Sequence, residues 1–184
     1  MNSKRSGSEK MAAAPNAAAF PNLTAILGPE DLKVIVGQYN AAAAGLGTKL
    51  SDQYPPIGPA LKGIAATLYP EATKTEVALS PANRERCLVA ILASRSRRLE
   101  LAIHAYLALG NSVTPPELAH IVVVSGIYTG IDTVSEGFDV LQTTFTVLKK
   151  AVKDQKADPQ NVIRALFGAF TPKPAGPESV NPEA

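Results

Sequence analysis

The chain has 184 residues, of which 46% are apolar and 18% charged, and its formal net charge is +2. So small a charge, with both signs mixed along the chain, excludes the basic footprint of a nucleic-acid-binding protein. The length suits one domain, and the apolar share exceeds what a lone small helical domain is expected to bury, which predicts a homo-oligomer, a trimer or a hexamer.

The two ends of the chain are predicted to lie outside the domain. Residues 1–19 are polar and then alanine-rich, which predicts a flexible leader rather than a secretory signal or a membrane span, and Met11 offers a second start. Residues 171–184 contain proline at short intervals and predict a disordered tail. The domain is therefore expected over residues 20–170, with no membrane partner.

Caps and breaks divide this domain into helices, so the predicted fold class is all-α, with about six to seven helices. Ser80, Thr114 and Asp158 each precede a proline, the arrangement of an N-cap followed by the first helical turn. The valine run at 122–124 could be mistaken for a strand, but the caps and the spacing of its neighbours favour helix. The helices are expected at about 28–44, 57–69, 81–93, 97–109, 115–128, 132–152 and 159–170.

The expected helix at 97–109 carries ionisable residues in an otherwise apolar run. Between Leu99 and Leu109 the only acidic or basic residues are Glu100 and His104, so we expect a buried helix in which both side chains need partners. At about 100° per residue, Arg97 shares a face with this pair. Glu100 would orient the imidazole for proton transfer, and Arg97 would hold Glu100 or a bound anion. A structural ion-pair network would use the same residues, so both interpretations stay open.

The segment 79–132 resembles a known family through several motifs in a fixed order. They are Leu79-Ser80-Pro81 at a helix start, Arg84-Glu85 before an aliphatic run, Glu100-Leu101 with His104, Val113-Thr114 with Glu117, and an aliphatic helix closing in Tyr128-Thr129-Gly130. Their order and spacing are similar to the core of the carboxymuconolactone decarboxylase and alkylhydroperoxidase D-like (AhpD-like) family. The resemblance implies an oligomerising AhpD-like helical bundle whose family core covers residues 79–150.

The peroxidase branch of this family needs thiols that the sequence lacks. That branch carries Cys-x-x-Cys-x-x-x-His after an upstream glutamate. Here the glutamate position is Glu85 and the histidine is His104, but the cysteine positions hold Arg97 and Glu100. Without the two thiols a hydroperoxide cannot be reduced by that route. Cys87 lies in an aliphatic run and is expected to pack in the core as a small apolar side chain.

The decarboxylase branch, whose members open a helix with Arg, Asp-Glu-Leu and His, is the closer match, although Leu99 replaces its aspartate. The resemblance implies His104, Glu100 and Glu85 as catalytic residues and Arg97 as the substrate-binding residue for a small acidic substrate. Loss of carbon dioxide from a carboxylated lactone leaves a dienolate that a cation stabilises, and a protonated His104 would protonate its carbon. This chemistry requires no metal or organic cofactor.

Other interpretations stay open. They are a hydroperoxidase that uses an external thiol with Cys87, another proton-transfer enzyme acting on a related small acid, and a non-catalytic oligomeric binding or stress protein. His120 is expected to be partly exposed and non-catalytic, and Tyr106 and Tyr128 to be core tyrosines with satisfied hydroxyl groups. A single cysteine excludes an internal disulfide and fits a reducing compartment, which predicts a cytoplasmic protein.

Overall fold

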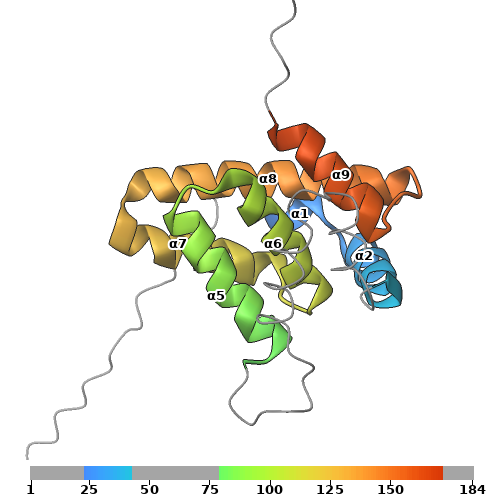
Figure 1. The fold of residues 1–184 in the computed structure, drawn as a ribbon, viewed down its shortest axis with the longest axis horizontal. Coiled ribbons are helices and arrows are strands. Elements are labelled where there is room, and N and C mark those ends of the chain that lie inside the picture. The colour runs from blue at the N-terminus through green and yellow to red at the C-terminus, as the bar shows by residue number, and fades with distance from the viewer. Residues whose placement is uncertain (1–22, 43–78, 172–184) are drawn as a thin grey trace, which may run out of the picture.

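The structure, a computed structural model, describes residues 23–42 and 79–171, and all regular elements in these ranges are α-helices (Figure 1). The predicted all-α fold class is therefore confirmed. The expected leader, the expected helix at 57–69 and nearly all of the expected tail lie outside the described residues. The described helices are α1 (Leu23–Ile26), α2 (Pro29–Ala42), α5 (Pro81–Ser94), α6 (Arg98–Gly110), α7 (Pro115–Thr129), α8 (Ile131–Lys153) and α9 (Pro159–Phe170).

Three of the helices begin where the sequence places a cap and a proline. The Ser80 hydroxyl accepts a hydrogen bond from the Asn83 backbone N–H, and the Asp158 carboxylate accepts one from the Asn161 N–H. Thr114 forms a full capping box with Glu117 at the start of α7. Each cap satisfies backbone donors that the first turn leaves without an intrahelical partner, which explains why these starts agree with the prediction.

The helices α7 and α8 run side by side as a hairpin, with α2 and α9 at the other end of the bundle and α5 and α6 between (Figure 1). Glycines permit the close approach of α7 and α8. A Cβ atom at Gly126 would clash with Val134, and one at Gly137 would clash with Val122. The helices α6 and α8 contribute most of the buried core residues of the described part, among them Leu101, Ala105, Tyr106, Leu109, Phe138, Leu141, Phe145 and Leu148.

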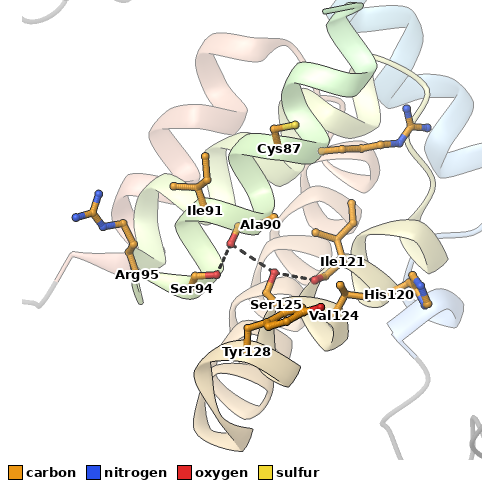
Figure 2. A pocket seen from close by; sticks show the side chains of 11 residues that line it. Cys87, Ala90, Ile91, Ser94, Arg95, His120, Ile121, Val124, Ser125 and Tyr128 are labelled. Atoms are coloured by element: carbon orange, nitrogen blue, oxygen red, sulfur yellow. Dashed lines mark hydrogen bonds between the residues drawn. The ribbon is translucent and has the colours of Figure 1, made fainter.

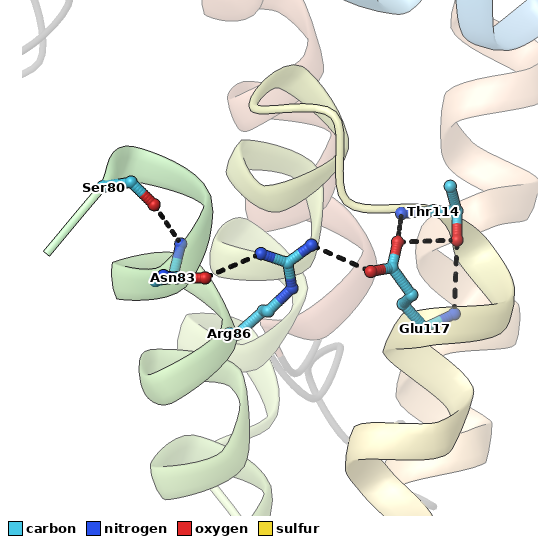
Figure 3. A network of polar contacts seen from close by, with 5 residues as sticks. All are labelled: Ser80, Asn83, Arg86, Thr114 and Glu117. Carbon is cyan, nitrogen blue, oxygen red and sulfur yellow. Dashed lines mark hydrogen bonds and ion pairs between the residues drawn. The ribbon is translucent and has the colours of Figure 1, made fainter.

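A polar network ties the start of α5 to the start of α7 (Figure 3). Arg86 forms an ion pair with Glu117 at 2.8 Å and donates a second hydrogen bond to the Asn83 side chain. The Thr114 backbone N–H, Arg86 and the Thr114 hydroxyl all donate to the Glu117 carboxylate, and they lower its pKa to about 2. The network therefore links the first turns of α5 and α7.

Several large apolar side chains remain exposed on α5, α7 and the start of α8. They are Ile91, Val124, Ile127, Tyr128 and Ile131, with 40–86% of their surface accessible. We call them the α5–α7 apolar face. In the described ranges, no helix combines the length and the apolar character that crossing a bilayer requires.

Candidate functional site

The centre of the candidate site is an acid–imidazole pair formed between α5 and α6. The Glu85 carboxylate is completely buried, and its Oε2 lies 2.8 Å from Nδ1 of His104. The His104 side chain is 21% exposed, so the ring reaches from the buried acid toward the surface. When Glu85 is ionised, Nδ1–H donates to it, and Nε2 is the ring nitrogen left for a ligand. The pair can therefore orient an imidazole for proton transfer.

A cation on the other side of the carboxylate completes the centre. Nε of Arg84 lies 3.8 Å from Oε1 of Glu85, and the Arg84 side chain is only 15% exposed. The buried carboxylate thus has an imidazole near one oxygen and a guanidinium near the other. Burying an ionised acid is costly unless such partners compensate its charge. Arg84 was part of the sequence motif but was not predicted as a site residue.

The structure brings Glu85 to His104 but does not bury the other two predicted site residues. Glu100 and Arg97 are exposed, and Arg97 is the N-cap residue of α6. The expectation that Glu100 is a buried partner of His104 was wrong. The helix buries the face that carries Leu101 and Ala105, whereas the Glu100 side of the first turns lies outside the contact with its neighbours. Arg97 and Glu100 thus lie at the exposed start of the helix face that carries His104.

A second set of polar groups, which the sequence did not predict, lies further along α6. The Asn111 side-chain N–H₂ donates to the Tyr39 hydroxyl at 3.2 Å and to the Leu107 carbonyl at 2.8 Å. The Tyr39 ring, from α2, meets the Tyr106 ring edge-on at a centroid distance of 6.0 Å. Burial raises the pKa of Tyr39, the Asn111 bond opposes this, and the Glu85 charge raises it further. Tyr39 is therefore within electrostatic reach of the Glu85 carboxylate.

Tyr106 is a core residue, as predicted, but its hydroxyl is not satisfied as expected. The residue has no exposed surface, and burial raises the pKa of its phenol. Among the residues that the structure describes, none forms a hydrogen bond with this hydroxyl. A buried hydroxyl without a partner is unusual and costs stability.

A separate open groove of about 660 Å³ lies between α5 and α7 (Figure 2). Its lining includes Cys87, His120, Val124 and Tyr128. The Ser125 hydroxyl on its floor donates to the Ile121 carbonyl, so this hydroxyl is used within the helix. Three residues of the α5–α7 apolar face, Ile91, Val124 and Tyr128, line the groove, and neither Glu85 nor His104 does.

Two predictions about residues of this groove were wrong. Cys87 is exposed rather than packed in the core, and Tyr128 is 86% exposed rather than buried. The inward face of α5 is set by Glu85, Val89 and Ala93, and a residue two positions from Glu85 points about 200° away around the helix axis. His120 is exposed, in agreement with the prediction of a surface histidine.

The described residues contain no cluster of three or more His, Cys, Asp or Glu side chains suited to a metal ion. Residues 60–143 match the model of the carboxymuconolactone decarboxylase family, a range that contains both Glu85 and His104. No curated protein and no solved structure shows a significant match to the chain. The resemblance predicted from the motifs at 79–132 is confirmed, because residues 60–143 of this chain match the model of the carboxymuconolactone decarboxylase family.

Proposed function

We propose that this protein is a cofactor-free carboxy-lyase, similar to 4-carboxymuconolactone decarboxylase, that acts on a small carboxylated lactone or a related intermediate of aromatic degradation. The observation that carries the proposal is the hydrogen bond between a completely buried carboxylate and a partly exposed imidazole, Glu85 to His104. Such a pair provides an oriented proton donor next to a surface that a small acid can reach.

In the proposed reaction, the bond between the lactone carbon and its carboxylate breaks and carbon dioxide leaves. The electron pair spreads to the ring carbonyl as a dienolate, which a nearby cation stabilises. Protonated His104 then delivers its Nε2 proton to carbon, becomes neutral and is protonated again from solvent. Glu85 is a positioning residue, because it holds Nδ1 and stabilises the imidazolium without touching the substrate.

Arg97 and Glu100 are assigned to the opening of the site. Both lie on the helix face of His104: Glu100 is one turn, and Arg97 two turns, closer to the start of α6. The Arg97 guanidinium is always charged and can bind a carboxylate through two hydrogen bonds, so it is assigned to substrate binding. Glu100 is assigned a catalytic role in proton exchange between His104 and solvent.

The position of Cys87 argues against a peroxidase that uses the same acid–imidazole pair. A thiol needs a nearby base or cation to become a reactive thiolate. Cys87 is exposed and points away from Glu85 on the opposite face of α5. Clear peroxide reduction by the wild type with an external thiol, lost in a Cys87→Ser variant, would contradict the lyase assignment.

The decisive experiment is carbon dioxide release from 4-carboxymuconolactone by the wild type, His104→Gln and the control His120→Gln. General acid–base catalysis contributes about 10²–10⁴ in rate, so we expect a loss of this size in His104→Gln. The control removes an exposed histidine from α7 and should keep full activity. Circular dichroism checks that helix content is unchanged. Full activity of folded His104→Gln would overturn the assignment.

We also propose that the protein works as a homo-oligomer in the cytoplasm. The α5–α7 apolar face supports assembly, because contiguous exposed apolar residues usually mark an interface. The single cysteine supports a reducing compartment. If instead the lactone is neither bound nor converted, the α5–α7 apolar face favours the alternative of a non-catalytic oligomeric binding protein.

A further inference from the structure

His104 and Asn111, the residue that follows the last turn of α6, lie on one side of this helix. Residues seven positions apart on an α-helix lie within about 20° of one line and about 10 Å apart along the axis. His104 and Asn111 have this spacing, with Leu107 between them. Tyr39 of α2 lies over the Asn111 end of this line, and Glu85 of α5 lies over the His104 end. The two contacts therefore border the same strip of α6.

The hydrogen bonds of Asn111 fix which way the Tyr39 hydroxyl points. The Leu107 carbonyl can only accept, so the Asn111 atom 2.8 Å from it must be the amide nitrogen. The same nitrogen lies 3.2 Å from the Tyr39 oxygen, which is therefore the acceptor in that bond. The hydrogen of the Tyr39 hydroxyl does not point at Asn111 and can be donated elsewhere.

The Tyr39 ring has little freedom to move away from this position. A Cβ atom at Gly110 would come within 2.5 Å of the ring carbons Cγ and Cδ1, so the ring rests directly on the backbone of α6. The edge-on contact with Tyr106 holds it from another side. Burial and the Glu85 charge raise the pKa of Tyr39, against the opposing effect of the Asn111 bond. The phenol is therefore neutral near pH 7 and remains a donor.

We infer that Tyr39 is a substrate-binding residue of the site: its hydroxyl donates a hydrogen bond to a carbonyl or carboxylate oxygen of the acid held over His104. The inference rests on the proposed function and extends it, because it assigns a neutral donor at the end of the site opposite to Arg97. A substrate with two oxygen groups, as in a carboxylated lactone, would present one of them to the Tyr39 hydroxyl while its reacting carbon lies over His104.

The test compares wild type with Tyr39→Phe, which keeps the ring on Gly110 and removes only the hydroxyl. The probe is the saturated analogue γ-carboxy-γ-butyrolactone, whose binding to the full chain is measured by calorimetry. A hydrogen bond to a charged group corresponds to a roughly ten- to hundredfold change in affinity. We expect a loss of this size in Tyr39→Phe and none in Tyr128→Phe, which removes an exposed hydroxyl.

A second variant tests the direction of the bond. In Asn111→Asp the carboxylate can only accept, so it turns the Tyr39 hydroxyl hydrogen toward itself and away from the ligand. We expect Asn111→Asp to weaken analogue binding as much as Tyr39→Phe does, with the thermal midpoint of each variant recorded. A variant that changes only the thermal midpoint and not the affinity would show a purely structural role and overturn the inference.

The outcomes separate this inference from the proposed function. The wild type could bind the analogue more tightly than Tyr39→Phe does and yet release no carbon dioxide from the lactone. This result would overturn the lyase assignment and keep Tyr39 as a binding residue. Turnover and binding that are equal in wild type and Tyr39→Phe would overturn the inference and leave the lyase assignment intact. Failure of the wild type to bind the analogue would overturn the inference as well.

Discussion

Glu85 shows how a single acid can organise its surroundings. The carboxylate has no exposed surface, so the protein must supply the partners that water would otherwise provide. His104 and Arg84 approach different oxygens of the carboxylate. Each of the two therefore limits how the other can move, and the imidazole is held with its second nitrogen directed away from the acid.

At the residue scale, Tyr106 provides a test of stability. Its hydroxyl is buried and forms no hydrogen bond within the described part of the chain. An unmade hydrogen bond costs about 1–3 kcal/mol, partly offset by the small void that removal of the oxygen leaves. Tyr106→Phe should therefore raise the free energy of unfolding by about 1 kcal/mol, measured by urea denaturation.

The control for this measurement is Tyr128→Phe. Tyr128 is 86% exposed, and surface substitutions of this kind change stability by less than about 0.5 kcal/mol. A Tyr106→Phe variant less stable than wild type would mean that the hydroxyl has a buried water as its partner.

At the scale of the elements, the contact between α5 and α7 should respond to acid through Glu117. Its pKa falls from an ordinary value of 4.5 to about 2 because the Thr114 backbone, Arg86 and the Thr114 hydroxyl donate to the charged form. Because the pKa of this carboxyl group is lower in the folded protein than in the unfolded chain, its ionised form stabilises the folded state above pH 4.5. That contribution is lost as the pH falls from 4.5 toward 2.

The variant Glu117→Gln removes this titration. The stability difference between wild type and Glu117→Gln should therefore be constant above pH 4.5 and shrink below it, as followed by denaturation at a series of pH values. Asp139→Asn, an exposed acid on α8, is the control for the loss of one negative charge. If the stability difference between wild type and Glu117→Gln does not depend on pH, the contacts of Arg86 and Thr114 with the ionised Glu117 carboxylate do not stabilise the folded protein.

The helices could be predicted from the sequence because their starts are encoded locally. Ser80, Thr114 and Asp158 act within three residues of themselves, and the described helices begin and end close to the predicted positions. The α1 turn was not predicted, since four residues carry too little periodicity.

The site could be predicted only in part. Helical periodicity placed Glu100 on the same face as His104 but could not show which edge of α6 its neighbours would cover. The family spacing pointed to Glu85, and the structure bonds this residue to His104 across two helices. Tyr39 meets Asn111 from 72 positions away, and no local pattern in the sequence signals a contact of that range.

At the scale of the whole molecule, the α5–α7 apolar face should hold the assembly together. Light scattering at micromolar concentration should find a trimer or hexamer for the wild type. Ile127→Lys, at a position 72% exposed, should disperse it because a buried ammonium without a partner is costly. Val34→Lys, at a 41% exposed position on α2, is the control and should leave the assembly intact.

A monomeric wild type would contradict this prediction. If Val34→Lys disperses the assembly and Ile127→Lys does not, the interface lies on another surface. Either result leaves the Glu85–His104 centre to be tested separately, because neither position contacts it.

The opposite directions of Glu85 and Cys87 on α5 have a practical consequence for spectroscopy. The chain has one cysteine, and it faces the open groove rather than the acid–imidazole pair. A fluorophore attached to this thiol would be a single label at a known position, and it would leave every side chain of the Glu85–His104 centre unaltered. Its emission would report on contacts between copies of the protein. The reaction at the Glu85–His104 centre would take place on the opposite side of α5, away from the label.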